Sequence, residues 1–255
     1  MKYQGTLLIV VGILINIPLL KSQIINIEDK RVRLGDSVTL KGYVDLGLNF
    51  YKNDKYLTTA RASFQVEKAL DKHFMMLIGG YNLVKGEGQN FLNDGFVHFR
   101  HNIDMNRHLV WETFTQVQYN ERTRMLFRGL LGAGVRIKLR LAQKQRFYIG
   151  TAYILEQNQF RDETPRQLNH RLSTYLSYNV QLPNKSRLVH TSYFQPLLTD
   201  FSSFRMASEV SWLMNITNRL IFKATANLSN DNDPRTPADI PDLTYSWTNG
   251  LRWDF

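Results

Sequence analysis

Residues 37–51 read SVTLKGYVDLGLNFY, and from Val38 onward apolar and polar side chains alternate along this stretch. Successive side chains of a β-strand point to opposite faces, so residues two positions apart share one environment. The apolar face of the stretch consists of Val38, Leu40, Gly42, Val44, Leu46, Leu48 and Phe50. The alternation outlasts the roughly five or six residues of an ordinary globular strand. The stretch therefore predicts one long strand with an apolar and a polar face.

The same two-residue period recurs through the rest of the chain. Clear repeats begin at Phe127, Leu168, Phe204, Leu220 and Leu243, and polar residues fill most of the intervening positions. A chain that repeats this pattern so often predicts a fold built from strands alone.

Two further segments are ambiguous. Residues 74–84 are apolar on both faces, and residues 96–103 carry His98, Arg100 and His101 without a clean face. We count both as strands because turn-forming residues bound them. They bring the predicted total to about twelve strands.

Turn-forming residues separate the predicted strands. Short polar connections are predicted at residues 71–73, 104–107, 143–145, 183–186 and 215–218. Longer connections are predicted at residues 85–94, 120–124, 158–167, 198–202 and 230–242. Short and long connections alternate, as in a membrane barrel with tight periplasmic turns and larger outer loops. The exception is Lys52–Lys55, a tight turn where an outer loop is expected.

The choice between a soluble β-fold and a membrane barrel depends on where the apolar face points, because soluble sandwiches and lipocalins turn it inward. After residue 22, no apolar run reaches the roughly 18 residues that a membrane helix needs. The long strands suit a crossing of about 9–11 tilted residues. Aromatic residues on the apolar faces gather near both strand ends, as at two membrane interfaces. We therefore predict an all-β, transmembrane, antiparallel up-and-down β-barrel of about twelve strands.

The N-terminus has the three parts of a secretory signal peptide. Lys2 supplies the positive region, Leu7–Leu20 is mostly apolar, and Ser22 is a small residue before the cleavage point. A retained anchor helix is the rival interpretation, but the apolar region is short and poorly flanked for one. The chain has no cysteine, which excludes a lipid anchor on that residue. We predict a signal peptide over residues 1–22, a short periplasmic segment over 23–36 and a bacterial outer-membrane barrel over 37–255.

The end of the chain resembles the assembly signal of bacterial outer-membrane proteins. The pattern is a polar residue, a glycine two places later and two hydrophobic residues, here Thr248, Gly250, Trp253 and Phe255. The resemblance implies recognition by the barrel-assembly machinery through strand pairing, because a terminal strand offers unpaired backbone groups before the barrel closes.

A wider resemblance rests on seven stretches in the expected order. They are VDLGLNF from Val44, NDGFVHFRHNI from Asn93, QVQYNE from Gln116, GLLGAG from Gly129, HRLSTYLSY from His170, SYFQPLLTDFSSFR from Ser192 and the terminal NGLRWDF. Over roughly residues 23–255 the chain resembles the salt-induced outer-membrane protein family, a domain family of unknown function. The resemblance implies an outer-membrane barrel with an envelope-stress role, and it implies no reaction.

One catalytic constellation is His190-Thr191-Ser192. Outer-membrane phospholipases and lipid A deacylases place a His and a Ser two positions apart on a strand, so that the base can activate the nucleophile. The Asn-Gly that tends to follow this serine in the phospholipases is absent, since Tyr193 comes next. Those enzymes also need the pair on the lipid face, whereas Val189, Thr191 and Tyr193 look like the lipid face here. We therefore expect lumenal hydrogen-bonding groups, with a lipid hydrolase as the alternative.

Histidine spacing predicts no metal site. His98 and His101 fall on opposite faces of one strand, and His73 and His108 lie near predicted periplasmic turns. No His-x-His pair or His–carboxylate cluster has the spacing of a zinc site. We predict neither a metal nor another cofactor.

Basic residues line the predicted lumen: Arg128, Arg136, Lys138, Arg140 and Arg171. Rings of Arg or Lys favour anions, so an anion-selective channel is one hypothesis. The other is a plugged interior in which inward acids pair with these residues, because unpaired charges are costly in a dry core. The candidate partners are Glu67, Glu112, Glu156, Glu209 and Asp254. We favour the plugged interior.

The formal net charge of +10 suits anionic partners, and an exported protein rarely meets nucleic acid. We expect contacts with outer-membrane lipids and with lipopolysaccharide phosphates through outer-loop residues such as Arg122 and Arg161. A small solute is a further possible partner. The resulting prediction is a non-enzymatic outer-membrane barrel with a structural, stress-related or narrow-pore role.

Overall fold

The computed structural model describes residues 39–52, 56–86, 89–142, 144–161, 166–183, 185–217, 220–233 and 242–253. The predicted signal peptide (1–22), the predicted periplasmic segment (23–36) and the terminal Phe255 lie outside these residues. The described part of the chain contains no helix that is long and apolar enough to cross a membrane.

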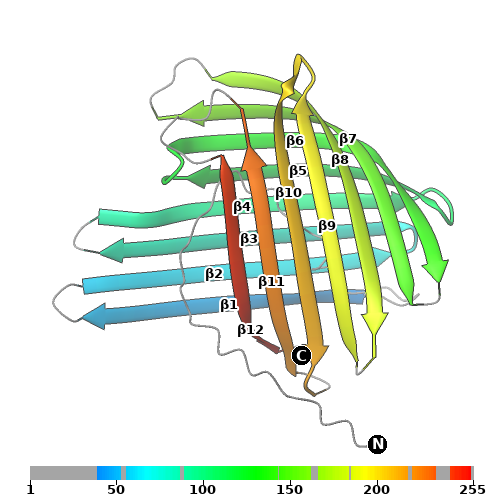
Figure 1. Cartoon of the computed structure of the whole chain (residues 1–255), viewed down its shortest axis with the longest axis horizontal. Coiled ribbons are helices and arrows are strands. Elements are labelled where there is room, and N and C mark those ends of the chain that lie inside the picture. Colours follow the sequence, from blue (N-terminus) through cyan, green and yellow to red (C-terminus); the bar gives the residue numbers. More distant parts are fainter. Residues whose placement is uncertain are drawn as a thin grey trace, which may run out of the picture.

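Twelve antiparallel strands form one sheet, and their order in space follows their order in the chain. The strands are β1 (Thr39–Lys52), β2 (Tyr56–Leu70), β3 (His73–Gly86), β4 (Gln89–Asp104), β5 (Leu109–Asn120), β6 (Met125–Ala142), β7 (Gln145–Phe160), β8 (Gln167–Leu182), β9 (Ser186–Leu197), β10 (Asp200–Asn215), β11 (Leu220–Asp231) and β12 (Leu243–Trp253). The sheet curls strongly, so that β9–β12 turn back across the early strands (Figure 1). Among the described residues, β1 and β12 are its two edges. The predicted all-β, up-and-down architecture is confirmed.

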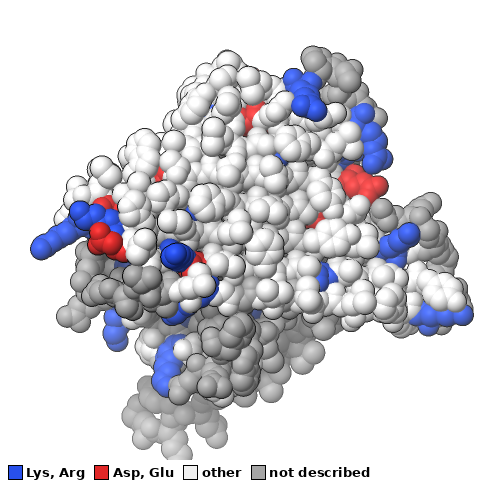
Figure 2. Space-filling model, turned by 180° about the vertical axis from the view of Figure 1, so that it is seen from behind, with Lys and Arg blue, Asp and Glu red and all other residues white. Residues whose placement is uncertain are grey.

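The two faces of the sheet are the reverse of those of a water-soluble protein. On the inner face of β5, Glu112 and Gln116 are only 3% and 5% exposed. On the outer face, Val117 of the same strand is 47% exposed and Leu131 of β6 is 60% exposed. Seen from behind, the wall is mostly uncharged, with charged side chains mainly towards its margins (Figure 2). This arrangement is expected of a wall whose outer face contacts lipid.

Strands β3 and β4 explain the two ambiguous segments. Met76 and Ile78 of β3 are almost completely buried on the inner face, where they pack with Phe74 and Phe96. Strand β3 is apolar on both faces because this part of the interior is itself apolar. On β4, the inward Phe96 is followed two residues later by the buried His98, so neither face of that strand is uniform.

The predicted long connection at residues 85–94 is wrong, because β3 continues to Gly86 and β4 begins at Gln89. Polar side chains at this end of the hairpin bond to one another across the two strands. The amide of Asn82 donates a hydrogen bond to Asp94 at 3.0 Å. A polar composition that is typical of a loop therefore belongs here to paired strands.

Strand β6 approaches β7 so closely that one position has no room for a side chain. A Cβ atom at Gly134 would lie 2.1 Å from the carbonyl oxygen of Thr151 and 2.5 Å from the Cα of Ala152. Both are backbone atoms of the paired strand, so rotation of a side chain cannot relieve the clash. Glycine inside a strand often marks such a close approach.

We predict that Gly134→Ala impairs folding, because the methyl group forces the paired β6 and β7 backbones apart. Loss of the heat-modifiable shift in gel mobility that folded barrels show would report this effect. Gly47→Ala is the matched control, since the nearest atom to its Cβ would be the Cβ of Arg61 at 4.0 Å. Unchanged heat-modifiable mobility of the Gly134 variant would contradict the prediction.

Candidate functional site

The predicted lumenal arginines lie inside the curled sheet. Arg128 of β6, Arg136 of β6 and Arg171 of β8 are buried, because each occupies an inner-face position of its strand. Lys138 lies nearer the rim, where its Nζ contacts Asp104 at 2.6 Å with both side chains partly exposed. Arg140 belongs to β6, but its side chain is outside the described residues.

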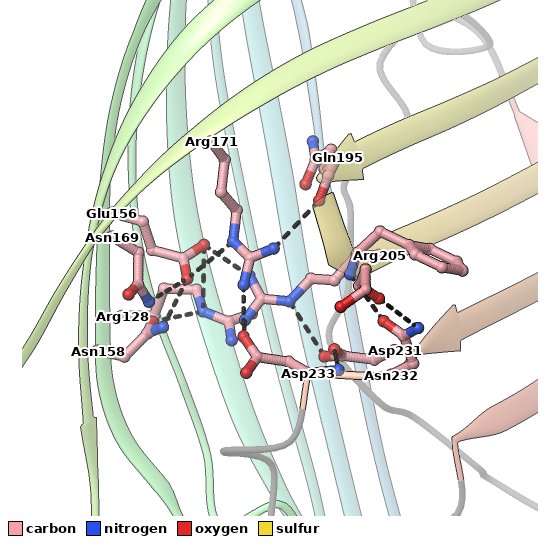
Figure 3. A network of polar contacts seen from close by, with 12 residues as sticks. Arg128, Glu156, Asn158, Asn169, Arg171, Gln195, Arg205, Asp231, Asn232 and Asp233 are labelled. Carbon is pink, nitrogen blue, oxygen red and sulfur yellow. Dashed lines mark hydrogen bonds and ion pairs between the residues drawn. The ribbon is translucent and has the colours of Figure 1, made fainter. Parts of the chain in front are cut away.

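Glu156 of β7 is the centre of a charged cluster, shown in Figure 3. Its carboxylate accepts a hydrogen bond from Nη1 of Arg205 at 2.6 Å. The Nε atoms of Arg171 and Arg128 lie 3.6 Å and 3.9 Å from its oxygens. All four side chains are almost completely buried. One carboxylate thus joins guanidinium groups from three other strands, β6, β8 and β10.

Two aspartates complete the charge balance of this cluster. Asp233, just beyond the end of β11, lies 2.5 Å from Nη2 of Arg171 and 3.8 Å from Nη2 of Arg205. Asp231 accepts a hydrogen bond from Nε of Arg205 at 3.1 Å. Three arginines therefore face three carboxylates. Matched charges with further hydrogen bonds can tolerate burial that a lone charge cannot.

Amide groups bind further polar atoms of the cluster. Nε of Arg128 donates to the side-chain oxygen of Asn158 at 2.8 Å. The amide of Asn158 in turn donates to Glu156 at 2.5 Å. Nη1 of Arg171 donates to the backbone oxygen of Gln195 at 3.1 Å. Such connected networks hold their members in one arrangement, because each group would lose its partners if it moved.

A second cluster lies around Glu112 of β5. Nη1 of Arg100 and Nε of Arg136 each lie 3.3 Å from its oxygens. The hydroxyl of Tyr175 donates a hydrogen bond to the same carboxylate at 2.7 Å. The guanidinium of Arg100 also lies over the ring of Phe114, 4.9 Å from its centroid.

Several of these contacts join strands that are not neighbours in the sheet. Tyr175 and Glu112 join β8 to β5, Arg205 and Glu156 join β10 to β7, and Arg171 reaches past β9 and β10 to Asp233. Each contact therefore crosses the inside of the curl. The predicted pairing of the basic residues with inward acids is confirmed for Glu112 and Glu156.

A small cavity lies against both clusters. It has a volume of about 50 Å³. Glu112 and Glu156 both line it, and Phe114, Leu130 and Ile154 form part of its apolar wall. At about 10–15 Å³ for each water centre, this space accommodates only a few water molecules.

The structure contradicts the expected orientation of His190 and Ser192. Val189, Thr191 and Tyr193 are the buried inner-face residues of β9, so His190 and Ser192 lie on the outer face. The interior next to β9 accepts Val189 and Tyr193 together with Thr191, which donates a hydrogen bond to the buried Ser177 at 3.2 Å. Tyr193 packs there against Tyr175, with ring centroids 5.4 Å apart.

Two histidines that are far apart in the sequence are in contact in the structure. His98 and His101 lie on opposite faces of β4, as predicted, but His101 meets His73 across the β3–β4 pair. Nδ1 of His73 lies 2.9 Å from Nε2 of His101, and the two rings stack. Within the described ranges, no group of three or more His, Cys, Asp or Glu residues is placed to hold a metal ion.

The residues of the predicted assembly signal are only partly within the described chain. Thr248 and Gly250 lie on β12 and are exposed, and Trp253 is the last residue of that strand. Phe255 lies outside the described residues. Recognition by the assembly machinery stays a prediction.

Sequence reasoning missed four charged members of the two clusters. Arg205 occupies a polar position of an alternating strand, so its inward orientation was available from the pattern. Arg100 lies on the strand without a clean face, and Asp231 and Asp233 lie in a segment that is predicted to be a loop. Strand pairing places Arg205 opposite Asp231 and Arg100 close to Glu112. Only the curl of the sheet brings Arg205 to Glu156 and Asp233 to Arg171, and no local signal in the sequence shows those contacts.

Residues 33–253 match the family described as "Protein of unknown function, DUF481". No curated protein matches the sequence. Among solved structures, the chain is similar to one described as "NanC porin structure in rhombohedral crystal form", with a TM-score of 0.52 and 8% sequence identity. The similarity covers 83% of this chain and 100% of that chain. At this identity the likeness shows a shared porin-like β-barrel fold and nothing more.

We predict that Glu156→Gln lowers the free energy of unfolding by about 3–5 kcal/mol, because it leaves buried guanidinium groups without their central counter-charge. Urea unfolding of the protein in lipid vesicles, followed by tryptophan fluorescence, measures the change. The matched control is Glu121→Gln, since Glu121 and Arg161 form an exposed pair at 3.6 Å. Loss of that pair is expected to cost less than about 1 kcal/mol. Equal losses in the two variants would contradict the prediction.

Proposed function

We propose a function from the geometry of this chain, which belongs to the DUF481 family of proteins of unknown function. The chain is an outer-membrane barrel whose interior is closed by ion pairs to all but the smallest solutes. The observation that carries this proposal is the set of buried contacts that cross the interior between strands that are not neighbours.

The membrane location is supported by the reversed faces of the sheet and by aromatic pairs on its outer side. Phe194 and Phe204 lie near the outer-loop ends of β9 and β10, with ring centroids 5.4 Å apart. Trp212 and Phe222 lie near the opposite ends of β10 and β11, 6.0 Å apart. Rings at two levels are expected where amphipathic side chains meet the two membrane interfaces. The predicted signal peptide and assembly signal favour the bacterial outer membrane in particular.

The interior favours a plug or a narrow pore over an open channel. A wide aqueous channel needs an interior free of side-chain contacts across it, whereas here Glu156 and Glu112 bind arginines from several strands. The cavity between the clusters accommodates a few water molecules. Any solute that passes is small and exchanges with these ion pairs.

The resemblance to the salt-induced outer-membrane protein family supports a role under salt or envelope stress. A barrel closed by ion pairs suits such a role, because it adds a stable wall element to the membrane without a large leak. Its partners are outer-membrane lipids and lipopolysaccharide phosphates at the outer loops, and the barrel-assembly machinery during insertion. Among the candidate phosphate contacts, Arg161 is exposed and close to Glu121 at 3.6 Å.

An anion-selective channel is the alternative for the same interior. Arg136 and Lys138 would then attract anions, and replacing both with Ala would reduce anion selectivity. Each residue already has an acidic partner, Glu112 and Asp104 respectively. We therefore expect weak selectivity, and a reversal potential that is unaltered in the double variant would count against the channel.

We predict that the wild-type protein in a planar bilayer is silent or shows only small conductance steps. The double variant Arg171→Ala/Asp233→Ala removes one contact across the interior together with both of its charges. It should give larger and more frequent steps, because nothing replaces the deleted side chains. Single-channel recording of the purified proteins measures the conductance of the wild type and of the double variant.

The matched control removes the ion pair at the rim, as Asp104→Ala/Lys138→Ala, and should leave the conductance unchanged. Folding of every variant is checked by heat-modifiable gel mobility. Large steps from the wild type would overturn the closed interior. So would a folded Arg171/Asp233 variant that conducts no better than the wild type.

A further inference from the structure

A cluster of hydroxyl and imidazole groups lies on the outer face of β9 and β10. His190 and Ser192 occupy adjacent outer-face positions of β9, and Ser208 is paired with Ser192 across the two strands. All three side chains are partly buried by their neighbours, without being enclosed in the interior. The sequence predicts that His190 and Ser192 face the lumen, which argues against catalysis on lipids. In the structure these two residues face outward instead.

The three polar groups are in hydrogen-bond contact. Oγ of Ser192 lies 2.9 Å from Nε2 of His190. Oγ of Ser208 lies 3.1 Å from the same nitrogen and 3.0 Å from Oγ of Ser192. A nucleophile and a base at this separation meet the geometric requirement for a serine that is activated by histidine.

The shared nitrogen gives the serine proton a defined destination. When Nδ1 carries the ring proton, Nε2 of His190 is an acceptor. Either Ser192 donates to it directly, or Ser192 donates to Ser208 and Ser208 donates to the ring. Both arrangements lead the proton of Ser192 to the same base.

The position of the cluster along the wall points to a lipid as the molecule that reaches it. Ser192 is two residues from Phe194, which pairs with Phe204 at the outer-loop ends of the strands. Trp212, at the opposite ends, is paired with Leu188, four residues from Ser192. With about 3.3 Å of rise per residue, Ser192 lies closer to the outer aromatic pair. Under the proposed orientation, it faces the outer leaflet.

We infer that Ser192 and His190 form a catalytic pair that cleaves acyl esters of membrane lipids. The inference rests on the proposed membrane location but not on the closed interior. Oγ of Ser192 attacks the ester carbonyl carbon, while Nε2 of His190 takes the hydroxyl proton and gives it to the departing alcohol. An acyl-serine remains. Water then attacks it, loses a proton to His190 and releases the fatty acid, and the proton returns to Ser192.

Ser208 acts as a positioning residue in this scheme. Its hydroxyl contacts both the nucleophile and the base, so it orients the Ser192 hydroxyl towards Nε2 without contacting the ester itself. Ser208→Ala should slow the reaction and shift its pH profile, because the base then has a single hydroxyl partner. Ser208→Thr keeps the hydroxyl and should restore the wild-type profile.

The test combines covalent labelling with an assay of turnover. The purified protein in detergent micelles is treated with an alkyl fluorophosphonate, and the modified residue is identified by peptide mass spectrometry. Fatty acid release is measured separately from phosphatidylethanolamine–phosphatidylglycerol micelles and from lipid A, which distinguishes the two sources of the ester. We expect an adduct on Ser192 and release from at least one of the two lipids. Ser192→Ala should abolish both, and His190→Ala should lower the rate of release by about 10²–10⁴-fold.

The matched control is Ser177→Ala, which removes a buried inner-face hydroxyl that bonds to Thr191 on the other side of the same wall. It should retain the adduct and the turnover. Folded protein that carries no adduct on Ser192 and releases no fatty acid would overturn the inference. Turnover that persists in Ser192→Ala would also overturn it. Neither result bears on the closed interior, because the single-channel recordings test that proposal independently.

Discussion

One constraint governs the interior of this sheet: a charge taken out of water needs a partner of opposite sign close by. Glu156 supplies that partner to arginines on β6, β8 and β10, and Glu112 does so for Arg100 and Arg136. Because these strands are not all neighbours, the same contacts that balance charge also hold the sheet in its curl. The polar side chains must then point inward to reach one another, and the apolar side chains are left on the outside. The reversed faces of the wall and the buried network therefore have the same cause.

The fold was largely predictable because a two-residue period leaves little choice of structure. Strand β1 shows it over its whole length, and the number and order of the strands follow from repeating it. The prediction failed where composition and structure diverge. Residues 85–94 are rich in polar and glycine residues, yet most of them lie on paired strands, where Asn82 donates a hydrogen bond to Asp94 across the pair. Strand β3 lacked a clean face because its inner side packs into an apolar patch. Local patterns report the average environment of a strand, and both failures are local departures from that average.

The site was predictable only in part, because orientation is a local property and pairing is not. Alternation along β6 and β8 shows that Arg128, Arg136 and Arg171 face inward. That Arg171 meets Asp233, 62 residues later in the chain, depends on how far the sheet curls between β8 and β11. No spacing in the sequence contains this information. A carboxylate in a proline-containing segment looks like part of a solvated loop until the curl places it beside two guanidinium groups.

Strand β9 shows how interior packing decides the chemistry of the exterior. Val189 and Tyr193 are apolar or aromatic, and on a lipid-facing wall such residues would ordinarily point outward. Here both are buried inside, Tyr193 against the ring of Tyr175, so His190 and Ser192 lie on the opposite face. A polar group that faces lipid is costly when it lacks a hydrogen-bond partner, and the mutual bonds of His190, Ser192 and Ser208 reduce that cost. The contacts that make an outward polar cluster tolerable in a membrane are the same contacts that bring a nucleophile and a base together. In the proposed function, the ion pairs close the inside of the barrel, and the inferred reactive groups lie on its outside.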